Sequence, residues 1–194
     1  MSDRQDTLFP DTRKELPVLQ GLDRSEVESL AFKILGEIEP FCLKAEIAGS
    51  IRRRRGVVND VDIVVLPKPQ VVVGAPDSWL NIVKVVRSEF GAVTVKQGPK
   101  LASFNIPVLC QKGGYVQVDL YRAEPETWGI LLLVRTGSKE HNVKLCNLAI
   151  SRGLRLKYSV GLTDQRGLVV AGRTEEEVFA ALGLPFISPG EREA

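Results

Sequence analysis

The sequence predicts an α+β fold, in which a mixed or antiparallel sheet flanked by helices is followed by a smaller α+β unit. In some segments apolar residues recur at helical spacing, and in others they alternate with polar residues at the period of two that is typical of strands. The chain has 194 residues, of which 44% are hydrophobic and 26% charged. It is therefore long enough to bury one sizeable core or two small ones.

The first part of the chain predicts an arm, a helix and a strand. Residues 1–21 have no sustained period and contain prolines, which predicts an extended arm. Asp23 and Glu26 match a capping box, and the helix that they begin is expected to end at Pro40. Alternation over residues 43–47 predicts a short strand.

A second helix and three strands are predicted beyond a loop over residues 67–76. Asp77 is the expected N-cap of this helix, whose apolar stripe ends before Gly91. The three strands are expected over residues 93–96, 102–110 and 115–121. The sequence Lys-Gly-Gly at 112–114 favours a hairpin turn between the last two strands.

The C-terminal part predicts three helices and two strands. One helix is expected from Pro125 to Leu133, and the next from Lys139 to the terminator Gly153. The predicted buried side of this second helix is Leu145, Cys146, Ala149 and Ile150. Strands over 154–158 and 168–170 precede a helix capped by Thr174 and Glu177.

One stretch combines a glycine, a serine, four arginines and two acids. Gly49-Ser50 can form a turn that presents backbone N–H groups and a hydroxyl to phosphate oxygens, and Arg52 to Arg55 follow it. Asp60 and Asp62 then begin an apolar run. On a strand their side chains share one face, with Cα atoms roughly 6.6 Å apart, while the opposite face can be buried. The stretch predicts a phosphate site beside a metal site.

Each part of this pattern also has a simpler interpretation. Four consecutive arginines are often a solvated turn or a non-specific polyanion-binding patch. An Asp-x-Asp pair also occurs on solvated faces of sheets. The combination of the Gly-Ser turn, the acidic pair and a β-branched strand favours the functional interpretation.

A second acidic strand repeats this design at Asp119, which shares a strand face with Gln117 and Tyr121. If this strand lies beside that of Asp60 and Asp62, the three carboxylates meet, because neighbouring strands are only about 4.8 Å apart. Such a cluster is self-repelling without divalent cations, and its oxygen ligands favour Mg²⁺ or Mn²⁺. The alternative is that Asp119 merely faces solvent.

Gly49-Ser50 with Arg52-Arg53, followed by Asp60-x-Asp62, resembles the nucleotidyltransferase superfamily, and the spacing is similar to that of the family X DNA polymerases, the polymerase beta group. Three further segments support the resemblance. They are 117–120, similar to the third acidic strand of that family; Thr136-Gly137-Ser138 with Asn142, similar to its nucleotide-binding turn; and 153–192, similar to its last subdomain. The likeness covers roughly Asp23 to the C-terminus.

The resemblance implies a DNA-directed DNA polymerase that adds deoxynucleoside triphosphates to a primer 3′-hydroxyl during gap-filling repair. It implies an arm (1–21), a catalytic palm (22–122) and a nucleotide-selecting, thumb-like subdomain (123–194). The implied catalytic and metal-binding residues are Asp60, Asp62 and Asp119, with two Mg²⁺ or Mn²⁺ ions per site. The implied nucleotide-binding residues are Gly49, Ser50, Arg53, Asn59, Thr136, Gly137, Lys139 and Asn142. The implied partner is primer–template or gapped DNA, bound by a monomer.

The chain departs from the family pattern at three places. Val134-Arg135 stands where an aromatic pair is usual, and Cys146 and Gln117 stand where arginines are usual. The resemblance therefore implies altered sugar discrimination and a weaker grip on the template. Only 48 residues precede Gly49, so we expect no lyase domain, no deoxyribose-phosphate lyase activity and a weak hold on the 5′-phosphate of a gap.

Composition limits the remaining options. A net charge of +2 permits DNA binding without requiring it. Three widely spaced cysteines indicate neither a zinc site nor a disulfide framework, and no apolar run approaches the roughly 18 residues of a membrane span. We expect a soluble cytoplasmic protein. His141, the single histidine, is expected at the surface or near a phosphate rather than on a metal.

Two other functions remain open at this point. A nucleotidyltransferase that modifies an RNA end, a protein or a small molecule would share the Gly-Ser and Asp-x-Asp elements. A non-catalytic DNA-binding module could use the arginine patch, and its binding would depend steeply on salt.

Overall fold

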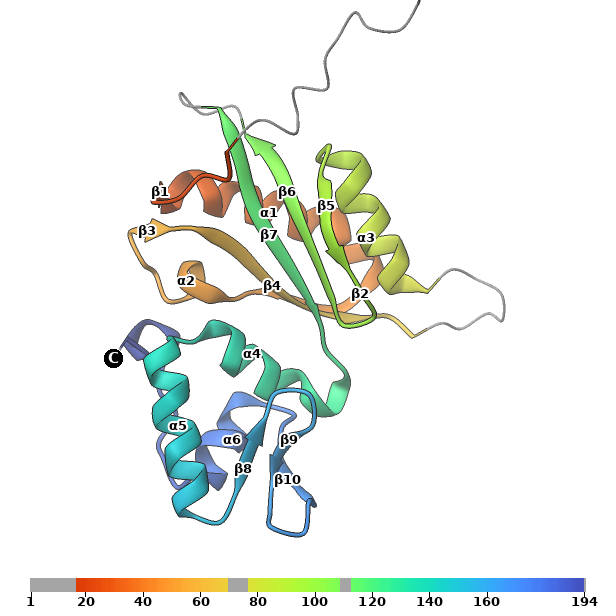
Figure 1. The fold of residues 1–194 in the computed structure, drawn as a ribbon. Helices are drawn as coiled ribbons and strands as arrows, with labels where there is room; N and C mark the ends of the chain where they lie inside the picture. The colour runs from red at the N-terminus through yellow and green to blue at the C-terminus, as the bar shows by residue number, and fades with distance from the viewer. Residues whose placement is uncertain (1–16, 70–76, 109–112, 194) are drawn as a thin grey trace, which may run out of the picture.

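The structure is a computed structural model that describes residues 17–69, 77–108 and 113–193. Predictions for residues 1–16, for most of the loop before Asp77 and for the first residue of the 112–114 turn lie outside the described residues. The described chain forms two lobes, one above the other in Figure 1. No helix in the described ranges is both long and apolar enough to cross a bilayer.

The N-terminal lobe consists of β1 (Leu22–Asp23), α1 (Arg24–Ile38), the 3-10 helix η2 (Glu39–Phe41), β2 (Cys42–Ile47), α2 (Gly49–Arg52), β3 (Val57–Val58), β4 (Asp60–Pro67), α3 (Ser78–Glu89), β5 (Val93–Gln97), β6 (Leu101–Val108) and β7 (Gly114–Arg122). The C-terminal lobe consists of η3 (Pro125–Thr127), α4 (Trp128–Thr136), α5 (Lys139–Ser151), β8 (Arg155–Lys157), β9 (Gly161–Thr163), β10 (Val169–Ala171), α6 (Glu175–Ala181) and η4 (Pro189–Glu191).

The main sheet has five strands in the order β2-β4-β7-β6-β5. Strands β4 and β7 run parallel, and the other neighbours are antiparallel. The sheet is therefore mixed, and the predicted α+β class is confirmed. The predicted hairpin pairing is also present, because Val108 lies opposite Gly114.

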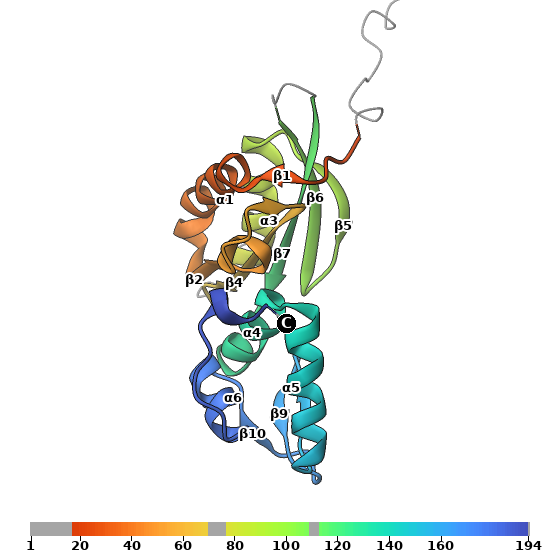
Figure 2. The ribbon, with the colours of Figure 1, turned by 90° about the vertical axis from the view of Figure 1, so that its left-hand side faces the viewer.

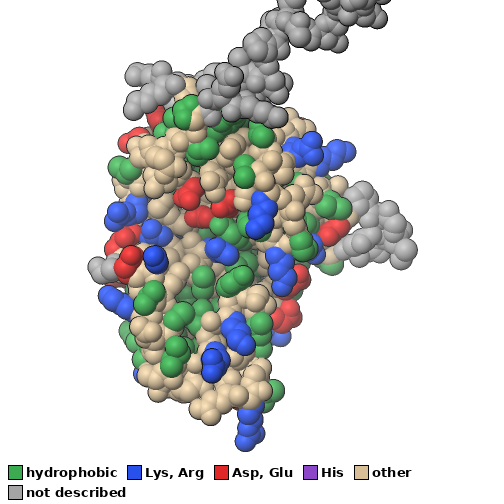
Figure 3. All heavy atoms as spheres, viewed as in Figure 1, with side chains coloured by type: hydrophobic (Ala, Val, Ile, Leu, Met, Phe, Trp, Pro, Cys, Tyr) green, Lys and Arg blue, Asp and Glu red, His purple; other side chains and the backbone are tan. Residues whose placement is uncertain are grey.

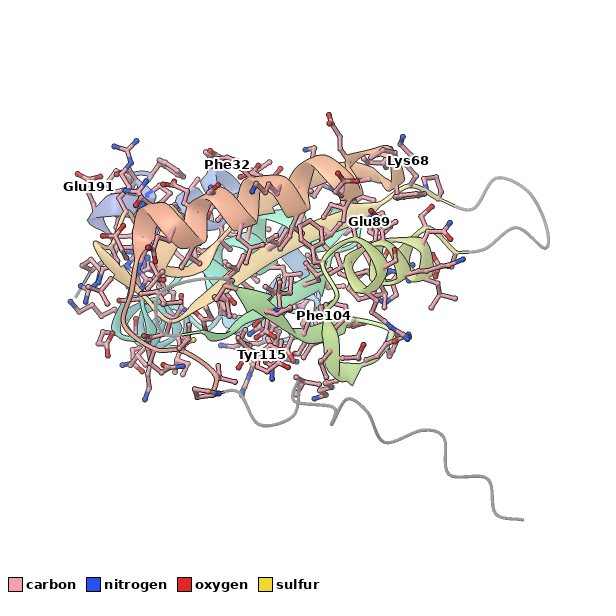
Figure 4. The ribbon with its side chains drawn as sticks, turned by 90° about the horizontal axis from the view of Figure 1, so that it is seen from above. Phe32, Lys68, Glu89, Phe104, Tyr115 and Glu191 are labelled. Carbon is pink, nitrogen blue, oxygen red and sulfur yellow. The ribbon has the colours of Figure 1, made fainter. Side chains whose placement is uncertain are left out.

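One face of this sheet is covered by α1 and α3, as Figures 1, 2 and 4 show from three directions. The apolar stripes predicted for these helices bury Ile34 and Ile38 of α1 and Trp79 of α3 against β4, β6 and β7. Phe32 points away on the outer side of α1 (Figure 4) and is 59% exposed. The Asp23 carboxylate caps α1, although it accepts from the backbone N–H of Ser25 rather than forming the predicted box with Glu26.

Among the described residues, α4 covers one end of the opposite face of the sheet. There α4 packs against the second half of β4 and the end of β7 in a separate apolar cluster. Its members are Ala48, Val64, Leu66, Tyr121, Ala123, Trp128, Leu131 and Leu132. The first half of β4, which carries Asp60 and Asp62, is left facing the space between the lobes.

The described part of the N-terminal arm is attached to the lobe. Val18 makes a parallel bridge with Tyr115, and the backbone N–H of Leu19 donates to the Tyr115 carbonyl. Leu22 then pairs with Val58 in the two-stranded β1-β3 sheet. From residue 17 onward the predicted extended arm is thus an added edge of the fold.

The C-terminal lobe packs α4, α5 and α6 against the three-stranded sheet β10-β9-β8. Four details differ from prediction. Residues 125–127 form a 3-10 turn before α4, and β9 was not predicted. Of the residues predicted to be buried in α5, Ile150 is 66% exposed and Cys146 is only partly buried. The predicted capping box of Thr174 and Glu177 is present and begins α6.

Candidate active site

A cavity of about 780 Å³ opens between the two lobes. It is bounded by the start of β4, the α2 segment, the end of α4 and the first half of α5. On the face shown in Figure 3, acidic side chains gather over the middle of the molecule, with basic side chains around and below them. All the predicted site residues line this cavity except Asp119 and Thr136.

The acidic residues come together through the register of two strands. Asp62 of β4 lies directly opposite Asp119 of β7, and Asp60 lies opposite Gln117. In a parallel pair, directly opposed residues place their side chains on the same face of the sheet. The predicted neighbourhood of the three aspartates is therefore present, although Asp119 lies behind Asp62 and is not part of the cavity wall.

Asp119 is held by residues of its own strand. Its Oδ2 accepts hydrogen bonds from the Tyr121 hydroxyl at 3.1 Å and from the Gln117 amide nitrogen at 3.3 Å. Its Oδ1 is buried and has no hydrogen-bond partner among the described residues. A buried carboxylate oxygen without a donor is costly, so this atom has capacity for a further ligand.

Burial and mutual repulsion disfavour the ionised form of the acidic pair. Burial, followed by the charges of Asp60 and Asp119, raises the pKa of Asp62 to about 7. Burial, followed by the charge of Asp119, also raises the pKa of Asp60, although Arg53 opposes the change. These are the properties of an anionic cluster that lacks a counter-charge.

The described Asp, Glu, His and Cys residues do not form a group of three arranged tightly enough to enclose one ion. The donor set nevertheless fits hard divalent cations. It is all oxygen, it includes the unpartnered Asp119 Oδ1, and burial, followed by repulsion from neighbouring carboxylates, raises the pKa values of Asp60 and Asp62. His141, which the sequence placed at the surface or near a phosphate, is instead buried in the C-terminal lobe against Phe179.

Gly49 allows Asp62 to lie against the α2 segment. Its φ is +59°, and a Cβ at this position would overlap Asp62 Oδ2. Gly49 to Arg52 form a short helix rather than the predicted turn, so the first backbone N–H groups lack intrahelical acceptors. The buried Ser50 hydroxyl also lacks a partner among the described residues. This segment supplies unsatisfied donors beside the acids.

The two central arginines have different surroundings, because successive residues of a helix point about 100° apart. Arg53 lines the cavity, donates from Nη1 to the Thr136 carbonyl, and donates from Nε to Glu193 at 2.7 Å. Arg52 points into the boundary between the lobes and makes two 2.8 Å bonds to Glu175. Sequence reasoning missed this role of Arg52. The available signal is the helical spacing, which makes Arg52 and Arg53 point in different directions.

Of the site residues predicted at the end of α4 and the start of α5, all but Thr136 line the cavity. Gly137 and Lys139 line the cavity, and Asn142 does so while its Nδ2 donates to the Val134 carbonyl at 2.8 Å. Thr136 is fully buried, and its hydroxyl accepts from Arg52, so it contacts the lobe boundary rather than the cavity.

Asn59 lines the cavity at the start of β4. Its Oδ1 accepts from the backbone N–H of Gly21 at 2.9 Å. The described part of the arm thus helps to hold the residue that precedes Asp60.

Arg135 is a cavity residue that sequence reasoning did not assign to the site. Its guanidinium lies 3.9 Å from the centre of the Tyr121 ring and 5.2 Å from that of Tyr158. Its charge lowers the pKa of Asp62 against the larger opposing effects. The only signal in the sequence is that an arginine occupies a position where the resemblance implied an aromatic residue.

A mixed sheet with paired acids beside a Gly-Ser segment, facing a smaller α+β lobe across a cavity, places the chain among the nucleotidyltransferases. Residues 131–193 match the family model described as DNA polymerase beta thumb. Over 171 residues the chain is 31% identical to the DNA polymerase/3′-5′ exonuclease PolX of Bacillus subtilis (strain 168), an alignment that covers 84% of this chain and 28% of the relative.

The fold is also similar to a crystal structure of Leishmania infantum polymerase beta in a ternary P/T complex. The TM-score is 0.73 at 23% identity, and the match covers 91% of this chain and 78% of the other. The chain belongs to the family X DNA polymerases, the polymerase beta-like group. It spans 28% of the length of the curated relative that it matches.

Proposed function

We propose that the chain is a DNA-directed DNA polymerase of the polymerase beta type, which adds nucleotides to a primer 3′-hydroxyl. The observation that carries the proposal is the opposition of Asp62 and Asp119 on parallel strands, next to the cavity lined by Gly49 and Ser50. This arrangement provides carboxylates for cations and backbone donors for a polyphosphate within one site.

The proposed metal ligands are Asp60, Asp62 and Asp119, which would hold two Mg²⁺ ions or, alternatively, Mn²⁺. When bound, such cations neutralise charge on the transferring phosphoryl group and make a hydroxyl a better nucleophile. Asp119 Oδ1 is the proposed acceptor for the proton of the primer hydroxyl, because this buried oxygen has no donor among the described residues. Tyr121 and Gln117 hold the other oxygen of Asp119 in place.

The proposed triphosphate site is the α2 segment. The N–H groups at its start and the Ser50 hydroxyl would bind β and γ oxygens, and Arg53 would neutralise charge on the departing pyrophosphate. Gly137 lies against the Arg53 guanidinium, where a Cβ would come within 3.1 Å of Nη1. A glycine at this position therefore leaves room for the arginine.

The proposed sugar and base contacts are Gly137, Lys139 and Asn142, with Asn59 at the opposite rim. Asn142 Oδ1 is buried and has no partner among the described residues, which leaves an acceptor beside the cavity. Thr136 would act indirectly by bonding Arg52. We propose the arm (1–21), the palm (22–122) and the thumb-like subdomain (123–194) as the corresponding functional divisions.

The proposed substrates are gapped or primed DNA and deoxynucleoside triphosphates, and the proposed role of the protein, as a monomer, is to fill short gaps in repair. Cys146 lines the cavity at the position where the resemblance implied an arginine. An uncharged side chain at this position supports the expectation of a weak grip on the template.

The experiment that tests this function is incorporation of single nucleotides opposite each template base in a one-nucleotide gap, with magnesium chloride. Templated incorporation supports the proposal. Addition that ignores the template, or transfer only to an RNA end or a protein, favours the other nucleotidyltransferase functions. Binding that falls steeply with salt but shows no incorporation favours the DNA-binding module.

A further inference from the structure

One carboxylate bridges the two arginines at the phosphate end of the cavity. Glu193 Oε1 accepts from Arg53 Nε at 2.7 Å, and Glu193 Oε2 accepts from Arg55 Nη1 at 3.2 Å. Both arginines line the cavity together with Gly49 and Ser50. The positive charge that would meet a polyphosphate is thus already paired with an anion of the protein itself.

The backbone before Glu193 is anchored, so this contact does not depend on a free tail. The Ser138 N–H donates to the Arg192 carbonyl at 3.1 Å. The Arg192 side chain is fully buried, bonding Glu175 at 2.6 Å and the Ile187 carbonyl. These contacts hold the residue next to Glu193 against the turn at the end of α4.

The ion pairs that Glu193 makes with Arg53 and Arg55 are weak enough for a ligand to displace the carboxylate. The Glu193 side chain is 36% exposed and that of Arg55 is 56% exposed, and ion pairs this accessible to water are weak. Only Arg53, at 15%, is well shielded. A polyphosphate carries several charges and many acceptor oxygens, so it can replace one carboxylate at both arginines.

We propose that Glu193 is an internal competitor for the polyphosphate site, which occupies Arg53 and Arg55 until a triphosphate displaces it and returns as pyrophosphate leaves. The inference rests on the proposed function and adds a residue that sets the affinity of the site. A tethered competitor weakens the binding of every ligand that must displace it by the same factor. Glu193 should therefore affect triphosphate and pyrophosphate equally.

The test compares Glu193→Gln with Glu140→Gln, which removes the same charge from an exposed residue in the first turn of α5. Titration calorimetry with magnesium chloride would measure binding of a deoxynucleoside triphosphate, inorganic pyrophosphate and deoxyadenosine. For Glu193→Gln, we expect both phosphate ligands to bind roughly three- to tenfold more tightly, which is what the loss of one or two weak ion pairs allows. Deoxyadenosine binding and the control variant should be unchanged.

Repeating the Glu193→Gln change in Arg53→Gln protein shows whether Glu193 acts through Arg53. In Arg53→Gln protein, the gain from Glu193→Gln should shrink, because the main partner of the carboxylate is gone. Equal or weaker phosphate binding by folded Glu193→Gln protein would overturn the inference while leaving the proposed function intact. Failure of the wild-type protein to bind either phosphate ligand would contradict both this inference and the proposed function.

Discussion

Asp62 and Asp119 lie directly opposite each other on the parallel strands β4 and β7, although α3 and two strands separate them in the chain. The apolar residues that alternate with them, Val61 and Val118, are fully buried on the helix-covered face. A slip of one residue in this register would bury the acids and expose the core. The packing of the sheet therefore fixes the acidic cluster.

The burial of Asp62, together with repulsion from Asp60 and Asp119, predicts an unusual dependence of stability on pH. The pKa of Asp62 is raised from 3.8 to about 7, so the native protein holds a proton that the unfolded chain releases. The stabilisation from this group is complete below the unfolded pKa and is lost as the pH rises towards the folded pKa. In metal-free protein at about pH 8, Asp62→Asn should raise the free energy of unfolding by as much as about 4 kcal/mol.

Urea denaturation in the presence of a chelator measures this change. The difference between Asp62→Asn and wild type should vanish below about pH 3, where the wild-type carboxyl is protonated in both states. Added Mg²⁺ or Mn²⁺ should stabilise the wild type more than the variant. A variant that is less stable than wild type at high pH would show that the carboxylate is not repelled in the folded protein.

Gly49 should be required both for folding and for activity. An alanine there must adopt a φ of +59° and also displace the Asp62 carboxylate. The matched control is Gly91→Ala, because Gly91 has a φ of +56° with nothing near the added Cβ. We expect Gly91→Ala to cost about 1 kcal/mol and to leave incorporation unchanged, whereas Gly49→Ala should cost about 2–4 kcal/mol and abolish incorporation. Equal effects of the two changes would contradict this account.

Glu175 should be the main ionic support between the lobes. It is buried, it makes two bonds to Arg52, and it bonds the fully buried Arg192. Glu175→Gln should reduce the free energy of unfolding by about 3–5 kcal/mol, because, among the described residues, it leaves the fully buried Arg192 guanidinium without a counter-charge and leaves Arg52 with only Glu46 at 3.6 Å. The exposed neighbour Glu176 provides the control, and Glu176→Gln should change stability by less than about 0.5 kcal/mol.

The lowered pKa of Glu175 also predicts that the protein loses stability in acid. Burial raises the pKa of Glu175, but the hydrogen bonds from Arg52 and Arg192 outweigh burial and bring the pKa below 4.5. Its stabilisation is therefore present above the unfolded pKa and is lost as the pH falls through the folded pKa. The melting temperature measured as a function of pH should show this loss of stability in acid for the wild type and not for Glu175→Gln.

Arg135 should influence catalysis through the ionisation of Asp62. Its charge lowers the pKa of that carboxyl, and Asp62 must be ionised to bind a cation. Arg135→Gln should move the acidic limb of the pH–rate profile to higher pH by several tenths of a unit. Lys33→Gln, on the exposed outer side of α1, is the control for net charge. An unchanged acidic limb would show that Arg135 does not influence the ionisation of Asp62.

The sequence was sufficient to predict a helix-flanked sheet with an acidic face. The start of β4 and the middle of β7 alternate, so the two faces of these strands could be assigned there before their pairing was known. The motif Gly49-Ser50 was recognisable because its backbone geometry is local, although it begins a short helix rather than the predicted turn.

Features that depend on distant contacts were not predictable. The bond between Arg52 and Glu175 joins residues 123 positions apart, and neither has a local pattern that names the other. His141 is buried because Phe179 of α6 packs against it. Strand β9 is placed by its pairing with β8 and β10 rather than by a pattern of its own. Ile150 lies one position beyond the buried Ala149, and the helical period alone did not separate them.

The most direct test of the central claim is single-turnover incorporation into a one-nucleotide gap by Asp119→Asn protein, with magnesium chloride and saturating nucleotide. The neutral amide keeps the size of the side chain but cannot hold a cation or accept the hydroxyl proton. We predict templated incorporation by wild type and a rate for the folded variant that is lower by a factor of about 1,000 or more. Incorporation by Asp119→Asn at close to the wild-type rate would contradict the assignment of the three aspartates as one catalytic site.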